Sequence, residues 1–104
     1  MKKNNSKLKS RSSLPNVRYL IDMYKEGKYF VGIARGLDYT GIGKTIDEAI
    51  KNTNKSVKLA LEWCYSNKTF ETVLKEAGFE PHLENNRKVW VCKNYLGSFS
   101  EEVA

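Results

Sequence analysis

The segment from Tyr29 to Leu61 constrains the fold more than any other part of the chain. Its first residues, YFVGIA, place alternate side chains on two faces, which is the period of a β-strand. Thr45 and Glu48 then form the pattern T-x-x-E. In this pattern the threonine side chain accepts from the N–H of Glu48, and the glutamate reaches back to the N–H of Thr45. The segment therefore predicts a strand, a turning stretch and a capped helix, in that order.

Gly43-Lys44-Thr45 is similar to the end of a phosphate-binding loop, G-x-x-x-x-G-K-[ST]. The first glycine of that motif would fall at position 38, where the chain has Asp38. A carboxylate at this place would repel a phosphate, and no apolar strand ending in aspartate follows. We therefore interpret the glycines as shaping a turn and Thr45 as a helix cap, and we expect no nucleotide and no other cofactor.

Two strands are expected before the turning stretch. Residues 17–24 alternate in the period of a strand, and the polar sequence KEGK at 25–28 supplies a hairpin turn in which Gly27 can adopt a positive φ. The strand at 29–34 is then its antiparallel partner. A short third strand is expected at 39–42.

The long helix is predicted from about Ile46 to Tyr65, because apolar residues recur there at steps of three and four. One stripe faces the sheet, and its members are Ile46, Ala49, Ile50, Thr53, Val57, Ala60, Leu61 and Cys64. Thr69 is expected to cap a second helix at 70–77, which Gly78 ends. Residues 79–83 and 88–94 flank a polar turn and predict another hairpin.

These elements predict an α+β fold, with a small antiparallel sheet in the order β-β-β-α-α-β packed on one long helix. A single domain is expected at 16–104, after a disordered basic tail at 1–15. The net charge of +6 resides almost entirely in that tail, which has five basic residues and no acidic ones. Its polar composition cannot bury enough surface to fold alone. It is either a solubilising leader or an arm for nucleic acid, through Lys2, Lys3, Lys7, Lys9 and Arg11.

The cysteines and the histidine do not form a metal-binding pattern. Cys64 and Cys92 stand 28 residues apart, and His82 is the single histidine, which leaves too few ligands for zinc. Both cysteines are expected to be reduced core thiols, although their spacing does not exclude a bridge. No apolar run has the length of a membrane span, and the N-terminal residues lack the apolar middle of a secretory signal. A cytoplasmic location without membrane contact is expected.

The order of elements and several short motifs resemble the HicB-like antitoxin family over residues of about 17–80. The matching residues are Tyr29-Phe30-Val31, Gly43-Lys44-Thr45 and Ile46-Asp47-Glu48-Ala49, followed by the helix through Asn52 and Leu61. The segment TFETVLKEAGFE is similar to the short tail helix of some members. The resemblance implies a partial ribonuclease-H-like sheet backed by one helix. It also implies a non-catalytic protein that binds and neutralises a small partner ribonuclease toxin.

The chain departs from the family pattern in two places. The family loop usually contains Leu-Pro-Gly, whereas residues 37–41 have no proline. Many members end in a helix-turn-helix or ribbon-helix-helix module that binds operator DNA, and residues 81–104 show neither pattern. These departures argue against sequence-specific DNA binding and leave the question of DNA binding open, whereas the resemblance still implies the protein-binding function.

Three alternatives to a toxin inhibitor follow from the residues. Asp22 and Glu48 suggest the carboxylates of a two-metal nuclease, but residues 88–94 lack the third acid, so we expect no catalysis. A nucleic-acid-binding protein would use the tail and stacking aromatics such as Tyr19, Tyr29, Phe30 or Trp90. A stand-alone inhibitor of another host or defence protein would use the same fold. In either inhibitor, an exposed sheet edge or face is the expected interface, and homo-oligomers are expected through the same edges.

Overall fold

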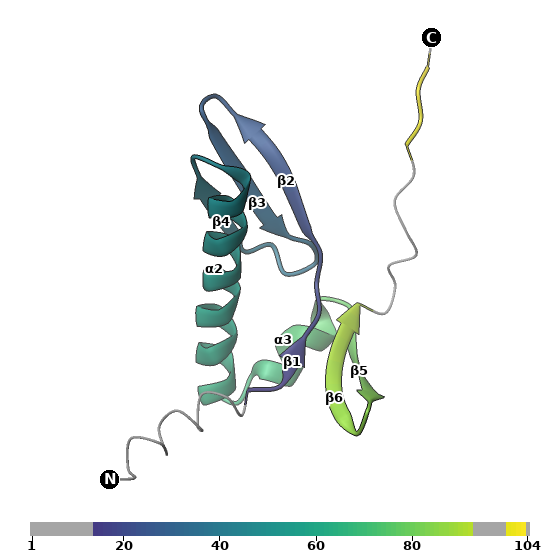
Figure 1. Cartoon of the computed structure of the whole chain (residues 1–104). Helices are drawn as coiled ribbons and strands as arrows, with labels where there is room; N and C mark the ends of the chain where they lie inside the picture. The colour runs from purple at the N-terminus through teal and green to yellow at the C-terminus, as the bar shows by residue number, and fades with distance from the viewer. Residues whose placement is uncertain (1–13, 93–99, 104) are drawn as a thin grey trace, which may run out of the picture.

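The computed structural model describes residues 14–92 and 100–103, which form an α+β fold (Figure 1). The elements in chain order are β1 (Asn16–Val17), β2 (Ile21–Glu26), β3 (Tyr29–Ala34), β4 (Thr40–Gly43), α2 (Ile46–Ser66), α3 (Phe70–Glu76), β5 (Phe79–Glu84) and β6 (Arg87–Cys92). The predicted α+β class is confirmed. The strands form two sheets rather than one, an antiparallel sheet β2-β3-β4 and a mixed sheet β1-β6-β5 in which β1 and β6 run parallel.

The first predicted strand, at 17–24, is divided in the structure. Its start belongs to β1, which pairs with β6, and its end belongs to β2, which pairs with β3. The residues between them bond to both sheets. The N–H of Arg18 donates to the carbonyl of Trp90 at 2.9 Å, and the carbonyl of Leu20 accepts from the backbone N–H of Arg35 at 2.8 Å. The alternation of side chains continues from β1 into β2. It shows which face of an extended segment is apolar, but it does not show which sheet the segment joins.

Both predicted hairpins are confirmed. The β2–β3 hairpin closes with Glu26 opposite Tyr29, and Gly27 in its turn has a φ of 62°. The β5–β6 hairpin turns at Asn85 and Asn86, whose φ angles are 51° and 65°. A two-residue hairpin turn favours positive φ at such positions, and asparagine tolerates it better than most residues do.

The predicted cap is present at the start of α2. The bond from the glutamate side chain back to the backbone is made one residue earlier than predicted. Thr45 Oγ1 accepts from the N–H of Glu48 at 3.1 Å. Glu48 Oε1 accepts from the N–H of Lys44 at 2.6 Å instead of the N–H of Thr45. The residues that are similar to a phosphate loop therefore bond to one another at the helix end, and the predicted cap is confirmed.

The predicted cap of the second helix is wrong. Thr69 stands at the N-cap position of α3 but makes no side-chain cap bond there. Its N–H and its Oγ1 donate to the carbonyl of Cys64, at 2.8 and 3.3 Å. The last carbonyls of a helix have no partner within the helix, and Thr69 bonds one of these at the end of α2 instead of capping α3.

The glycines before α2 allow close packing, and the prediction that Gly41 and Gly43 shape a turn is wrong. A Cβ on Gly41 would lie 2.2 Å from the backbone nitrogen of Thr53, and a Cβ on Gly43 would lie 2.6 Å from that of Ala49. Both glycines sit in β4, directly against the helix (Figure 1). The positive φ angles of this stretch belong instead to Gly36, at 87°, and Asp38, at 64°.

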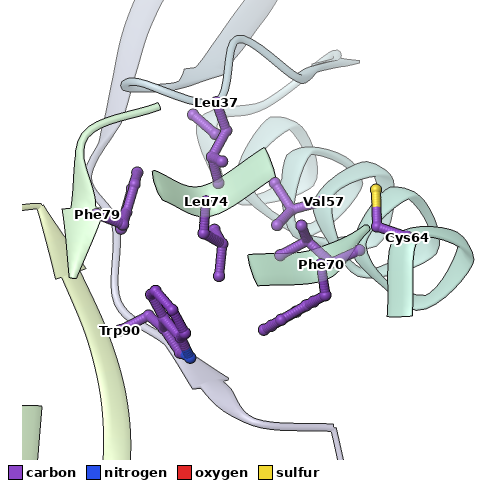
Figure 2. Packing of buried hydrophobic residues seen from close by; sticks show 9 residues of the cluster. Leu37, Val57, Cys64, Phe70, Leu74, Phe79 and Trp90 are labelled. Carbon is purple, nitrogen blue, oxygen red and sulfur yellow. The ribbon is translucent and has the colours of Figure 1, made fainter. Parts of the chain in front are cut away.

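The main hydrophobic cluster lies where the end of α2 meets α3, β5 and β6 (Figure 2). Its buried members are Ala34, Leu37, Val57, Leu61, Cys64, Phe70, Leu74, Phe79 and Trp90. Phe70 and Trp90 pack edge to face, with ring centroids 6.2 Å apart. Cys64 is buried and Cys92 half-buried against the cluster, and both are free thiols. No helix of the described residues is both long and apolar enough to cross a membrane.

Candidate functional site

One face of the sheet β2-β3-β4 packs on α2, and the other has no helix against it in the part of the chain that the structure describes (Figure 1). Gly32, Gly41 and Gly43 point toward α2, as their close approach to the helix shows. Because neighbouring side chains in a strand point to opposite faces, the residues between them point away. We call this surface the open face. Its members are Asp22, Tyr24, Glu26, Tyr29, Val31, Ile33, Thr40 and Ile42.

A row of apolar side chains crosses the open face. Val31 is the register partner of Tyr24 on one side and of Ile42 on the other, so the row spans all three strands. Tyr24 is 54% exposed and Ile42 is 56% exposed, while Val31 between them is half-buried. Single exposed apolar residues are common on proteins, whereas adjoining ones mark interaction surfaces. The row is therefore a candidate for a binding surface.

An ion pair borders this row. Arg35 Nε donates to Asp22 Oδ2 at 3.0 Å, and a terminal guanidinium nitrogen of Arg35 bonds to Asp22 Oδ1. The Asp22 side chain is 29% exposed and that of Arg35 is 34% exposed. The guanidinium hydrogen bonds hold the pKa of the Asp22 carboxyl below its usual value. The Asp22 carboxylate is therefore ionised at neutral pH and paired with Arg35, and this ion pair lies at one border of the open face.

Replacing Asp22 with asparagine is expected to lower the free energy of unfolding by about 1 kcal/mol at pH 7, because a two-point charged contact is lost. The folded-state pKa of Asp22 is depressed, so its contribution is present above the unfolded carboxyl pKa of about 3.9 and is lost as the pH falls through the folded value. Urea unfolding of the unmodified chain and of Asp22→Asn, between pH 7 and pH 2.5, measures the difference in their free energies of unfolding. A difference that stays constant down to pH 2.5 would contradict the ion pair.

Asp22 and Glu48, the two carboxylates considered for a nuclease, lie on opposite sides of the sheet. Asp22 is on the open face and is bound by Arg35, whereas Glu48 is in the first turn of α2 and is bound at the cap. They cannot hold one metal ion between them. Within residues 14–92 and 100–103, no group of three His, Cys, Asp or Glu side chains is placed to hold a metal.

The two edges of this sheet differ. On β4, the carbonyl of Ile42 accepts from Asn52 Nδ2 and the carbonyl of Thr40 accepts from Ser56 Oγ, both at 2.7 Å. Two side chains of α2 thus bond the outer carbonyls of β4, as an added strand would do. The β2 edge has no such cover among the described residues. A covered edge is a common protection against unwanted strand pairing.

The aromatic residues considered for nucleic acid do not form one surface in the part of the chain that the structure describes. Lys2, Lys3, Lys7, Lys9 and Arg11 lie outside the described residues. Trp90 is 1% exposed within the hydrophobic cluster, so its ring offers no stacking face. Tyr19 packs against the same cluster, its hydroxyl bonds to Asn54, and burial raises the pKa of its phenol.

The other aromatic and histidine candidates are at separate places on the surface. Tyr29 remains exposed, and the ring of Phe30 lies 5.2 Å from the ammonium of Lys25. His82 is exposed, and its ring bonds to Glu80 at 2.8 Å. No common nucleic-acid surface results from these residues.

The row formed by Tyr24, Val31 and Ile42 was not singled out by sequence reasoning. The available signal is the sequence TGIG of β4, in which glycines alternate with larger residues. Such a strand can lie close to a helix on its glycine side only, which leaves Ile42 on the other side.

Comparisons with known proteins do not place this chain in a family. No family model matches it, and searches of curated proteins and of solved structures likewise give no match. A functional conclusion therefore has to come from the open face and from the sequence motifs.

Proposed function

We propose that this chain is a non-catalytic inhibitor that binds a small ribonuclease toxin and neutralises it in the cytoplasm. The observation that carries the proposal is the exposed row of Tyr24, Val31 and Ile42 on the open face. The motif resemblance to HicB-like antitoxins supports the class of partner. Neutralisation requires only that the inhibitor binds over the partner's active surface. It needs no catalytic side chain of this chain.

The open face has the composition of a small docking surface. Tyr24 offers a flat ring with a polar end, the side-chain type that most often anchors protein interfaces. Burying the exposed parts of Tyr24 and Ile42 under a partner would contribute on the order of 1–2 kcal/mol each. The rigid pair of Asp22 and Arg35 at the border presents a charged rim beside the apolar row. These features favour a protein partner over a small molecule.

The distribution of charge along the chain favours a protein partner bound through apolar contacts over a nucleic acid bound through its phosphates. The five basic residues of the tail account for most of the net charge, and residues 16–104 have a net charge of only +1. Nucleic-acid affinity from such a tail would be salt-dependent and without sequence preference. Protein docking on the open face would resist moderate salt because apolar contacts are not screened.

Affinity co-purification of the full chain from its native cells, followed by mass spectrometry, tests the proposal. We expect a small ribonuclease in near-equal molar amount, retained in about 0.5 M salt, where screening acts within a few ångströms. Recovery of nucleic acid alone, released by that salt, would contradict the proposal and favour the nucleic-acid alternative. Recovery of a protein that is not a ribonuclease would overturn the toxin partner and favour the stand-alone inhibitor.

A further inference from the structure

The β2 edge of the sheet carries outward-pointing backbone groups that have no partner among the described residues. The carbonyl of Leu20 bonds to Arg35 on the β3 side. In an antiparallel ladder the backbone groups of alternate residues point to opposite sides. Asp22, Tyr24 and Glu26 therefore bond to β3, and the residues between them, Ile21, Met23 and Lys25, direct their N–H and C=O groups away from the sheet.

This edge contrasts with the one on β4. There α2 supplies Asn52 and Ser56 as hydrogen-bond donors to the outer carbonyls. The described residues supply no such donor to β2, although this strand is six residues long. A long edge with unsatisfied groups is a template for pairing with another strand. We propose that β2 pairs with β2 of a second copy, antiparallel about a two-fold axis at Met23, to form a six-stranded sheet.

The charges of β2 exclude the registers centred on Asp22, Tyr24 and Lys25. Outward-pointing residues must face outward-pointing residues, so the axis has to pass through one residue of the strand. An axis at Asp22 or Lys25 would set that residue against its own copy, and an axis at Tyr24 would set Asp22 against Glu26. Like charges directly opposite one another destabilise a strand pair.

The axis at Met23 avoids every such conflict. It places Met23 opposite Met23 and Ile21 opposite Lys25, so all three outward residues of each copy join the ladder. Tyr24 then lies opposite Asp22 of the second copy, with its hydroxyl on the same face as that carboxylate. Leu20, which is 47% exposed, lies opposite Glu26 and gains cover for its side chain. The strand is self-complementary in this register.

The size of the contact sets the expected affinity. Stable interfaces bury about 1,200–2,000 Å² in total, and one pair of six-residue strands with its flanking side chains falls at or below the low end. We therefore expect a dissociation constant on the order of 10 μM, near −7 kcal/mol. The pairing goes beyond the proposed function, because it needs no ribonuclease and leaves Ile42 on the far strand uncovered.

Sedimentation of the full chain over a range of concentrations tests the pairing. The 11.9 kDa chain is expected to approach twice that mass at high concentration and to dissociate on dilution. Met23→Pro removes an outward N–H but no bond to β3, a position where an edge strand accepts proline. It should raise the dissociation constant at least 10-fold, whereas Met23→Leu should leave it unchanged. A monomer at all concentrations, or a dimer equally stable in Met23→Pro, would overturn the proposal.

A cysteine variant keeps the test decisive if the proline variant does not fold. Met23→Cys in a Cys92→Ser background should form a disulfide-linked dimer on mild oxidation. Facing residues of a hydrogen-bonded antiparallel pair have Cα atoms about 5.5 Å apart, which a disulfide spans. Leu83→Cys in the same background places a more accessible thiol on β5, away from the β2 edge, and is the control. Equal cross-linking of the two variants, or none at position 23, would overturn the pairing. Ribonuclease recovery with either variant is a separate readout of the proposed function.

Discussion

Replacing Gly41 with alanine is expected to destabilise the protein by about 3 kcal/mol, the upper part of the range for overpacking. The new Cβ would lie 2.2 Å from the nitrogen and 2.7 Å from the Cα of Thr53. These are backbone atoms of α2, so no side-chain rotation relieves the clash. The helix must move away from β4, and the bonds from Asn52 and Ser56 to that strand would lengthen. Chemical denaturation measures the loss as a lower midpoint.

Gly27→Asn is the matched control. Gly27 has a positive φ, but a Cβ at this position would have no neighbouring atom within 4 Å, and asparagine tolerates that backbone conformation. We expect a change of less than about 1 kcal/mol. If Gly41→Ala were as mild as this control, the close approach of α2 to β4 would be contradicted.

Replacing Ile42 with lysine is expected to weaken binding of the proposed ribonuclease partner at least about 100-fold, or roughly 3 kcal/mol, the effect of losing a central interface residue. The change sets a charge in the apolar row of the open face. Ile42 is more than half exposed, so the fold itself should tolerate lysine. Titration calorimetry with the recovered partner measures the loss, and circular dichroism checks that the variant is folded.

Leu83→Lys makes the same chemical change on the other sheet. Leu83 is 78% exposed on β5, away from the open face. The variant should bind the partner as the unmodified chain does. Equal weakening by the two lysines would indicate an effect of net charge and would remove the open face as the binding surface.

Local sequence rules predicted the local structure well. The pair Thr45 and Glu48 marked the start of α2, and Gly27 marked a hairpin turn, because each depends on bonds within a few residues. The division of the first strand was not predictable in this way. Whether Val17 pairs with β6 depends on a strand about 70 residues later in the chain, which no local pattern records.

The position of the candidate binding surface needed the structure for a similar reason. The alternation in β3 and β4 defines two faces but does not say which one α2 covers. That choice is made by Gly32, Gly41 and Gly43, whose missing side chains admit the helix on one side only. Ile46 and Ile50, expected in the buried stripe, are exposed for a related reason: α2 turns only its glycine-facing side to the sheet. The sequence predicted that an exposed face or edge would be the interface, and the structure shows which residues its open face carries.

The ribonuclease activity of the recovered partner, measured against increasing amounts of this chain, tests the central claim most directly. We predict that RNA cleavage falls to background near one equivalent of chain, and that Ile42→Lys needs a large excess while Leu83→Lys does not. Full cleavage in the presence of excess chain, or equal inhibition by Ile42→Lys, would contradict neutralisation through the open face.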